Sequence, residues 1–402
     1  MKQSRTHAIQ VDKEALTSNQ NDKETTLNPL VLEYMRTPPM SMNNDDMAST
    51  SSSHVVHTNE KIYVEKDIDK TPPILTDPRE QTFTNVHETQ VSPRGECDLH
   101  NLYSRCEKSP GHPDFIPFTS LTLRHLPEGH RNRHLYKLIK TVGGLTARVA
   151  VQMTSPDRPK CWPGTPHAYP FFQQSLSTAL RTGTGLVSKV DRFTDGVNRY
   201  HGQHWKSLTN CWCSHCEKSD SPSSVWYEFE LYTAAHLIFD DTEARCASLR
   251  LFHDRDDSPE VIVDRLVVDH ADVDKDWCRL KCVTCDKSLG EKLERLRENF
   301  YVAWDRVNEL YKGIRDVEKL TFIVSHPHGC FKHVSFGSWV NLVQKDDDEL
   351  DRKFTYTTPT CLGSSGASVQ CVGFSVWGWD QLVHSGSLLE PKLNYSGVGF
   401  LW

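Results

Sequence analysis

Hydrophobic positions follow a regular pattern only in the later part of the chain. Residues 1–115 are rich in Ser, Thr, Asn, Asp, Glu and Pro, as in SMNNDDMASTSSSHVVHTNE, and show no sustained apolar period. Such a segment buries too little apolar surface to offset the entropy that its chain loses on folding. Residues 1–115 are therefore predicted to be a disordered polar tail, and residues 116–402 are predicted to fold.

Within the folded part, many short segments alternate between hydrophobic and polar residues, which is the period of a β-strand. Polar and glycine-containing turns separate these segments, and this arrangement predicts a sandwich or a barrel. The predicted strands are residues 145–153, 183–190, 225–236, 247–252, 261–268, 277–283, 319–326, 333–340, 367–377 and 382–386.

One helix divides the strands into two groups. Large apolar residues recur every three or four positions between residues 288 and 315, which predicts an amphipathic helix of about eight turns. A linker helix that covers one sheet is the main interpretation, and a coiled-coil dimer seam is the alternative. The apolar positions are Leu289, Leu293, Leu296, Phe300, Trp304, Val307, Leu310 and Ile314.

Composition limits the classes of partner and compartment. The net charge of −7 argues against a general nucleic-acid binder, which needs a basic face for phosphate. No apolar run approaches the roughly 20 residues that span a bilayer, and the first residues lack the apolar core of a signal peptide. Thirteen cysteines is an odd number, and several stand two or three residues apart. This spacing favours metal ligation in a reducing compartment, so we expect a cytoplasmic protein with no membrane partner.

The stretch TPTCLGSSGASVQCVG (358–373) contains Ser365 between a serine and a glycine. A flexible turn is one interpretation, because glycine and serine both favour turns. The other is a nucleophile in a tight loop. A serine hydroxyl is a poor nucleophile at neutral pH, so it needs an imidazole to accept its proton and a carboxylate to orient that imidazole.

Candidate partners for Ser365 occur earlier in the chain. In LYTAAHLIFD (231–240), a predicted strand ends in two alanines followed by His236. In DKDWCRLKC (274–282), Asp276 directly precedes the alternating pattern of another strand. Asp272 and Asp274 are nearby competitors. Asp276 is preferred because the Trp-Cys-Arg-Leu pattern begins immediately after it.

These three segments resemble the landmarks of trypsin-like, chymotrypsin-fold serine proteases. TAAH, Asp-x-x-x-Leu and GSSGASV occur in that family's order of histidine, aspartate and serine. GTGLVSKV (183–190) and IVSHPHG (323–329) are similar to segments of the intracellular and Deg-like members. The resemblance implies a mainly β fold of two six-stranded antiparallel barrels, at about 145–286 and 317–402, joined by the helix at about 287–316.

The resemblance also implies roles for individual residues. Ser365 would be the nucleophile, His236 the general base and then acid, and Asp276 the group that orients the imidazole. The backbone N–H groups of Gly363 and Ser365 would form the oxyanion hole. The implied function is a serine endopeptidase that cleaves peptide or protein substrates through an acyl-enzyme and needs no cofactor for catalysis. The substrate-pairing strand would contain His384, Ser385 and Gly386.

Two positions depart from the family pattern. Ser368 stands where the family usually has proline, and Ser364 stands where secreted trypsins have an acid that binds a newly freed N-terminus. The alternative function is therefore a catalytically inactive protease-like binding or scaffold protein, braced by structural zinc.

The cysteine clusters CWCSHC (211–216) and CRLKCVTC (278–285) suggest that zinc site. Two C-x-x-C pairs can present four thiolates in a tetrahedron, and the predicted ligands are Cys213, Cys216, Cys282 and Cys285. The gap of 66 residues (282 − 216) is longer than in a compact zinc ribbon. Free thiols and disulfides are the alternatives. His326 and His328 are interpreted as loop residues of the second barrel.

Overall fold

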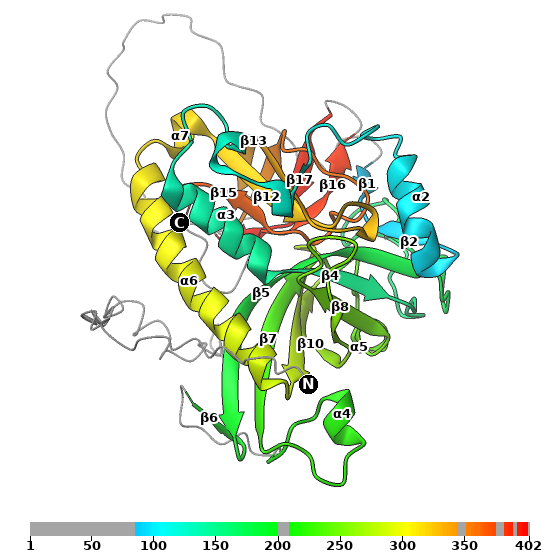
Figure 1. Ribbon diagram of the computed structural model, residues 1–402. Helices are drawn as coiled ribbons and strands as arrows, with labels where there is room; N and C mark the ends of the chain where they lie inside the picture. Colours follow the sequence, from blue (N-terminus) through cyan, green and yellow to red (C-terminus); the bar gives the residue numbers. More distant parts are fainter. Residues whose placement is uncertain (1–84, 200–208, 345–350, 375–381, 389–391, 401–402) are drawn as a thin grey trace, which may run out of the picture. The chain divides into compact units, whose positions relative to one another are not determined.

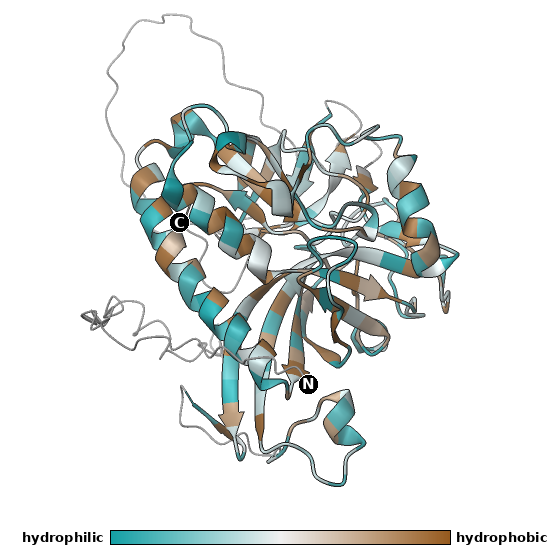
Figure 2. Cartoon of the chain, viewed as in Figure 1, coloured by the Kyte–Doolittle hydropathy of each residue, from teal (hydrophilic) through white to brown (hydrophobic). Residues whose placement is uncertain are grey.

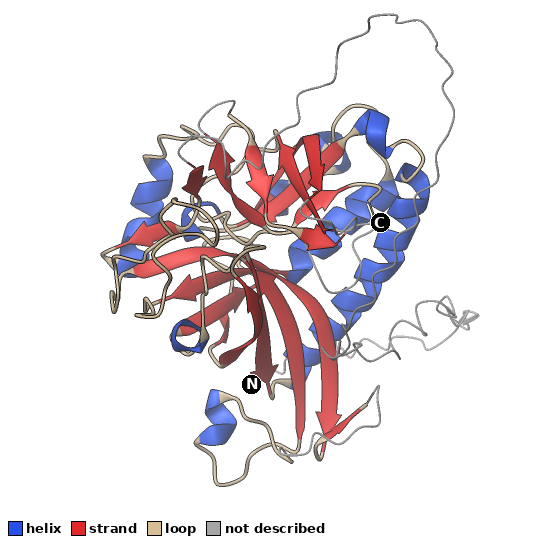
Figure 3. Cartoon of the chain, turned by 180° about the vertical axis from the view of Figure 1, so that it is seen from behind, coloured by secondary structure: helices blue, strands red, loops and turns tan. Residues whose placement is uncertain are grey.

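The computed structural model describes residues 85–199, 209–344, 351–374, 382–388 and 392–400 (Figure 1). These residues are mainly β and form two antiparallel sheets that curl, as the long curved strands in Figure 3 show. None of the helices within these ranges is long and apolar enough to cross a membrane.

The first sheet is built around β5 and β7, which pair antiparallel along most of their length. Its order is β10-β11-β7-β5-β4-β8-β9, with β2 and β6 also paired to β5. Its strands are β2 (Gln90–Ser92), β4 (Thr146–Val151), β5 (Leu180–Thr194), β6 (Val197–Asn198), β7 (Val225–Thr233), β8 (Ala247–Leu251), β9 (Val261–Val263), β10 (Leu266–Asp272) and β11 (Trp277–Thr284).

Most strands of the second sheet come after the first sheet in the sequence. Its strands β1 and β3 are the exceptions, because they precede β4. Its order is β1-β16-β17-β14-β13-β12-β15, with β18 paired to β14 and β3 paired to β13. Its strands are β1 (Asn85–His87), β3 (Ile116–Pro117), β12 (Leu320–Ser325), β13 (His333–Gln344), β14 (Asp351–Tyr356), β15 (Val369–Cys371), β16 (His384–Leu388), β17 (Asn394–Ser396) and β18 (Gly399–Phe400).

Two longer helices, α3 (Arg133–Leu145) and α6 (Lys287–Tyr311), pack against each other and against the first sheet. Each begins with a side-chain cap. Asn132 accepts from the N–H of Leu135 at 2.8 Å, and Asp286 accepts from the N–H of Leu289 at 3.1 Å. Figure 2 shows hydrophilic and hydrophobic residues alternating around α6, as expected for a helix that covers a sheet. The short helices are α2 (Leu99–Ser104), α4 (Ser214–Glu217), α5 (Asp241–Ala244) and α7 (Arg315–Glu318), with 3₁₀ turns η1 (Gly95–Asp98), η2 (Phe118–Ser120), η3 (Leu123–His125) and η4 (Pro327–Gly329).

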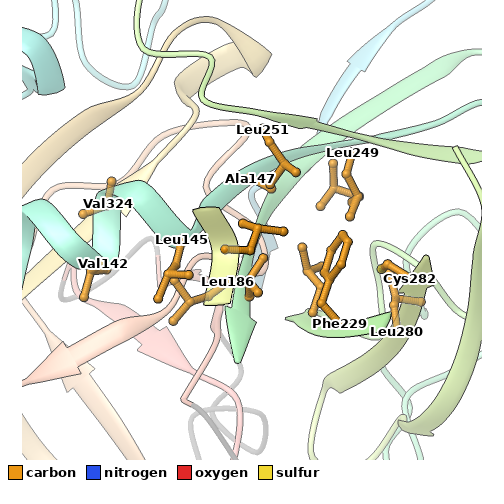
Figure 4. Close-up of a cluster of buried hydrophobic side chains, with 14 of the residues drawn as sticks. Val142, Leu145, Ala147, Leu186, Phe229, Leu249, Leu251, Leu280, Cys282 and Val324 are labelled. Atoms are coloured by element: carbon orange, nitrogen blue, oxygen red, sulfur yellow. The ribbon is translucent and has the colours of Figure 1, made fainter. Parts of the chain in front are cut away.

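The main hydrophobic core lies inside the first sheet and extends past α3 to the second. Leu249, Phe229 and Leu280 contribute from β8, β7 and β11 (Figure 4). Leu145 of α3 and Val324 of β12 belong to the same cluster. Burial of this apolar surface stabilises the strands that carry the candidate site.

The structure differs from the sequence prediction in the tail, in the number of strands and in the end of the long helix. Residues 85–115, predicted to be disordered, contain β1, β2 and α2, while residues 1–84 lie outside the described residues. Each sheet has nine strands, whereas six per barrel were predicted. Helix α6 ends at Tyr311, whereas the predicted helix continued to residue 315.

Candidate active site

His236 lies just beyond the end of β7. Ala234 and Ala235, which precede it, are fully buried, and the N–H groups of Leu237 and Ile238 both donate to the carbonyl oxygen of Ala234. This turn ends the strand and directs the His236 side chain toward the second sheet. The imidazole is also fully buried.

Asp276 immediately precedes β11 and has a left-handed backbone conformation, with φ of 56°. Its carboxylate accepts from the backbone N–H of His236 at 3.1 Å and lies 2.9 Å from the Nδ1 atom of His236. The Ser385 hydroxyl of β16 donates to the same carboxylate. The competitor Asp272 has another role, because it accepts from the backbone N–H of Lys275 at 2.9 Å and so holds the turn between β10 and β11.

Ser365 lies in a tight loop between β14 and β15. Gly363 has φ of +93°, and a Cβ atom there would lie 2.3 Å from the carbonyl oxygen of His326, so the loop requires glycine at this position. The N–H of Ser364 donates to the carbonyl oxygen of Cys361 at 2.9 Å, and the Ser364 hydroxyl accepts from the N–H of Cys361 at 3.1 Å. Ser364 therefore shapes the loop that presents Ser365.

The first sheet holds this loop through Thr184 of β5. The N–H of Thr184 donates to the carbonyl oxygen of Ser365 at 2.8 Å, and its hydroxyl donates to the carbonyl oxygen of Gly363 at 2.8 Å. Ser368, which stands at the unusual position of the loop, forms an antiparallel β-bridge with Val383. Its hydroxyl accepts a hydrogen bond from the Gln370 side-chain amide at 2.6 Å.

The three candidate catalytic side chains form one hydrogen-bonded chain. The Nε2 atom of His236 lies 2.8 Å from Oγ of Ser365, and its Nδ1 atom faces the Asp276 carboxylate. A carboxylate accepts hydrogen bonds only, so Nδ1 carries the proton and Nε2 can accept one from the serine hydroxyl.

Residues 85–90 of the chain lie across these groups. β1 pairs antiparallel with β16, so that His87 is opposite Gly386. The carbonyl oxygen of Glu88 accepts from the N–H groups of Gly363 and Ser365, at 2.6 and 3.4 Å. The Glu88 N–H donates to Oγ of Ser365 at 3.1 Å. The predicted oxyanion-hole donors therefore converge on one carbonyl oxygen.

The Glu88 side chain fills a polar pocket beside β16. Its carboxylate is buried and lies 2.7 Å from Nε2 of His384, and it also contacts the Lys108 ammonium and the Ser387 hydroxyl. Nδ1 of His384 lies 2.6 Å from the Tyr356 hydroxyl. Burial lowers the pKa of His384 well below its usual value, and it lowers the pKa of Lys108 to about 8.

The cysteine cluster brings together a different set from the predicted one. Sulfur atoms of four cysteines lie within 4.8 Å of one another: Cys211, Cys213, Cys216 and Cys285. Cys282 does not join them. It points from β11 into the main core, on the same face as Leu280 (Figure 4), because side chains two residues apart share a face of a strand. Burial raises the pKa of Cys285 to about 12.

A second group of potential metal ligands lies behind the loop that carries the candidate nucleophile Ser365, here called the nucleophile loop. Its atoms, from buried side chains, also lie within 4.8 Å of one another: Cys106, His112, His328 and Cys361. From the sequence, His328 was interpreted as a loop residue and Cys361 as a residue that packs in the core. Nothing in the spacing of these residues along the chain indicates that they meet.

Sequence reasoning also missed three residues around the candidate active site. Glu88 and Lys108 fall in the segment that composition marked as disordered, and Tyr356 lies in β14, which has no strand prediction. The pocket is built from elements far apart in the chain, so no local pattern reveals it.

No family model and no curated protein matches this chain. Among solved structures, the chain is similar to an HtrA-type protease, AlgW, with a decapeptide, at 11% identity and a TM-score of 0.32, covering 65% of this chain and 63% of that one. It is also similar to the Rv3671c protease from M. tuberculosis in its active form, at 8% identity and a TM-score of 0.31, covering 66% of this chain and 82% of that one. These likenesses are coarse, so the functional proposal rests on the geometry of the site.

Proposed function

We propose that this protein is a serine endopeptidase in which Ser365 is the nucleophile, His236 the general base and Asp276 the residue that orients the imidazole. The single observation that carries the proposal is the continuous hydrogen-bonded chain from Ser365 through His236 to Asp276, beside two backbone N–H groups that share one carbonyl oxygen. Each part has a separate task in acyl transfer.

In the proposed reaction, Oγ of Ser365 attacks the peptide carbonyl carbon while its proton passes to Nε2 of His236. The imidazolium is stabilised by the Asp276 carboxylate 2.9 Å from Nδ1. The same proton then passes to the leaving nitrogen, and the C–N bond breaks to leave an acyl-enzyme. Water, deprotonated by His236, resolves the ester.

Negative charge develops on the carbonyl oxygen during this attack. The N–H groups of Gly363 and Ser365 are fixed by the loop, so they need no reorganisation when the charge appears. In another acyl-transfer enzyme, losing one side-chain donor of the oxyanion hole raises the barrier by about 2.7–4 kcal/mol.

Labelling with a fluorophosphonate probe tests this proposal. In the folded full chain we expect an adduct on Ser365, located by mass spectrometry of digested protein, and we expect none in His236→Ala. His134→Ala, which alters an exposed histidine of α3, should label as the unaltered chain does. An unlabelled Ser365, or equal labelling of His236→Ala, would favour a binding or scaffold protein instead.

We also propose structural zinc at the group of Cys211, Cys213, Cys216 and Cys285. Zinc–sulfur bonds of about 2.3 Å place tetrahedral thiolates about 3.8 Å apart, and the Sγ atoms of Cys213 and Cys285 lie 3.6 Å apart. The group joins the loop before β7 to the end of β11, so bound zinc would brace the first sheet.

Protein purified without chelator should contain zinc at this group, and Cys285→Ser should lose one zinc ion per chain by elemental analysis. A chelator should lower the melting temperature of the unaltered chain, because metal that binds only the folded state stabilises it. Cys282→Ala is the matched control and should keep its zinc. If Cys282→Ala loses its zinc and Cys211→Ala keeps it, the ligand set predicted from the sequence is supported instead.

A further inference from the structure

The backbone of residues 85–88 occupies the place of an added strand on β16. Antiparallel pairing places Val86 opposite Ser387 and His87 opposite Gly386. A Cβ atom on Gly386 would lie 2.5 Å from the carbonyl oxygen of Val86, so β16 lacks a side chain where this segment approaches. Extended peptides that add a strand to a sheet bind in this manner.

The main chain of Glu88 is held at the catalytic groups. Its carbonyl oxygen accepts from the N–H groups of Gly363 and Ser365, which are the donors assigned to the oxyanion hole. Its N–H donates to Oγ of Ser365. The carbonyl group beside the nucleophile therefore belongs to the chain itself.

The chain continues from Glu88 onto the other sheet. Gln90 of β2 is opposite Thr182 of β5, and the pairing extends to Ser92 opposite Leu180. The Glu88–Thr89 bond thus lies between two β-pairings, one with each sheet. Both sides of this bond are fixed before any reaction begins, which favours attack through proximity and orientation.

The Glu88 pocket has the chemistry of a carboxylate site. A buried carboxylate needs hydrogen bonds and a compensating charge, and Lys108 supplies the charge. Nε2 of His384 lies 2.7 Å from the Glu88 carboxylate, and because a carboxylate only accepts, this nitrogen donates. Nδ1 of His384 lies 2.6 Å from the Tyr356 hydroxyl, which donates to the carbonyl oxygen of Tyr395. A neutral side chain in the pocket would leave the Lys108 ammonium hydrogen-bonded to Ser387 but without a carboxylate counter-charge.

We propose that the Glu88–Thr89 bond is a substrate of this chain's own active site, and that the pocket of Lys108, Tyr356, His384 and Ser387 selects glutamate on the acyl side of the cleaved bond. This proposal rests on the peptidase function proposed above.

The reaction balances as ordinary hydrolysis. Oγ of Ser365 bonds to the Glu88 carbonyl carbon, and its proton passes through His236 to the Thr89 nitrogen as the C–N bond breaks. Water then supplies a hydroxyl to Glu88 and a proton to Ser365. The products are residues 1–88 with a new carboxylate and residues 89–402 with a new amine, the latter 314 residues long (402 − 88).

Incubation of the purified full chain tests this proposal, with products read by intact mass and N-terminal sequencing. The unaltered chain is expected to yield a fragment that begins at Thr89, and Ser365→Ala should stay intact. Glu88→Gln, which keeps the size of the side chain and removes its charge, should slow this cut at least about 100-fold. Glu107→Gln, at an exposed glutamate, should be cut at the normal rate.

Fluorophosphonate labelling of the same samples separates the two proposals. If Ser365 is labelled but the chain stays intact, or Glu88→Gln is cut at Thr89 as fast as the unaltered chain, self-cleavage with glutamate selection is overturned and the peptidase proposal stands. If Ser365 is not labelled, both fail. A synthetic peptide of residues 85–90 should also be hydrolysed faster by the processed enzyme than its glutamine analogue, and equal rates would contradict the selectivity.

A second, independent observation concerns the buried group behind the nucleophile loop. Sγ of Cys361 lies 3.1 Å from Sγ of Cys106 and 3.1 Å from Nε2 of His328. The other nitrogen of His328, Nδ1, lies 2.7 Å from the side-chain oxygen of Gln90. Gln90 therefore holds the proton at Nδ1 and leaves the Nε2 lone pair directed at the sulfur atoms, which is the arrangement of a metal-binding histidine.

His112 completes this group. Its side chain is 3% exposed, and neither ring nitrogen has a hydrogen-bond partner among the described residues. The ring stacks on Tyr103 with centroids 4.1 Å apart, so it is held in place although its polar atoms are unsatisfied. An unsatisfied buried nitrogen is costly, and a metal ion would satisfy it.

We propose that Cys106, His112, His328 and Cys361 bind a zinc ion, with two sulfur and two nitrogen ligands in a tetrahedron. Such an ion would join the segment after α2 to the loop that carries Ser365. Because both cysteines and both histidines lie after Thr89, self-cleavage would leave this site intact.

Zinc content and a cobalt spectrum test the second proposal. His112→Gln should bind one zinc ion fewer per chain than the unaltered protein, whereas Cys246→Ser, at an exposed cysteine, should not. Co²⁺ added to metal-free Cys211→Ser, in which the four-cysteine group is disrupted, should still give thiolate-to-cobalt absorption that disappears on His112→Gln. Unchanged zinc in His112→Gln, or a disulfide between Cys106 and Cys361 found by mass spectrometry, would overturn it.

Discussion

Asp276→Asn is expected to lower kcat for peptide hydrolysis by about 10⁴-fold, the scale of this substitution in other serine proteases. The carboxylate oxygens of Asp276 lie 2.9 and 3.0 Å from Nδ1 of His236 and hold the proton there. An asparagine amide can donate to Nδ1 instead, which places the imidazole proton on Nε2. That nitrogen then cannot accept the proton of Ser365.

The measurement is the initial rate of hydrolysis of a peptide of residues 85–90, together with the rate of fluorophosphonate labelling. Asp272→Asn is the matched control. Its amide oxygen can still accept from the N–H of Lys275, so both rates should stay close to those of the unaltered protein. If Asp272→Asn loses as much activity as Asp276→Asn, the carboxylate assignment is wrong.

Glu243→Gln is expected to lower the free energy of unfolding by about 3–5 kcal/mol, because it breaks a buried ionic network. Glu243 is fully buried, and its two carboxylate oxygens lie 2.7 Å from Nε of Arg158 and 3.0 Å from Nη2 of Arg181. The variant leaves both guanidinium groups buried without a counter-charge. Arg158 also donates to the carbonyl oxygen of His236 at 3.0 Å, so the loss of stability extends to the turn that carries His236.

Urea unfolding with linear extrapolation measures this change. The control Glu260→Gln alters a carboxylate that is 74% exposed and 3.9 Å from Arg250, and exposed pairs contribute about 0–1 kcal/mol. If Glu243→Gln lowers the free energy of unfolding by less than about 1 kcal/mol, the ionic network does not contribute to stability as predicted.

The pH dependence of this contribution has a definite sign. Burial alone would raise the pKa of Glu243, but the hydrogen bond and charge of Arg158, with the charge of Arg181, lower it below its usual 4.5. A carboxylate with a lowered pKa in the folded state contributes stability that is complete above the unfolded value. That contribution is lost as the pH falls through the folded value.

The parts of the fold that the sequence predicted are those with a strong pattern of their own. Residues 145–153 and 183–190 alternate clearly and correspond to β4 and β5. β1 and β2 have only three residues each and are formed by pairing with β16 and β5. Their stability comes from the partner strand, so the polar composition around them predicted no structure.

Some residues of the candidate site could also be predicted from the sequence, and others could not. His236, Asp276 and Ser365 stand in short segments with a recognisable order, and the structure brings them together. Glu88 lies 277 positions from Ser365, and nothing in its own segment indicates a bound carboxylate. Contacts of this kind depend on topology, which local patterns do not specify.

The group of cysteines that the structure brings together differs from the zinc ligand set that the spacing predicted. Cys282 and Cys285 form a C-x-x-C pair, but Cys282 lies within β11 and Cys285 lies just beyond it. The alternation of a strand sends Cys282 to the core face together with Cys278. Strand alternation therefore separates Cys282 from the four-cysteine group, in which Cys211 from CWCSHC takes the fourth place.

The contacts of Thr184 have a consequence for how the protein unfolds on heating. It belongs to the first sheet, yet it bonds the carbonyl groups of both Gly363 and Ser365 and also accepts from the N–H of His326 at 3.0 Å. The nucleophile loop thus depends on both sheets at once. We expect the two halves to melt in a single calorimetric transition, with enzyme activity and native circular dichroism lost at the same temperature.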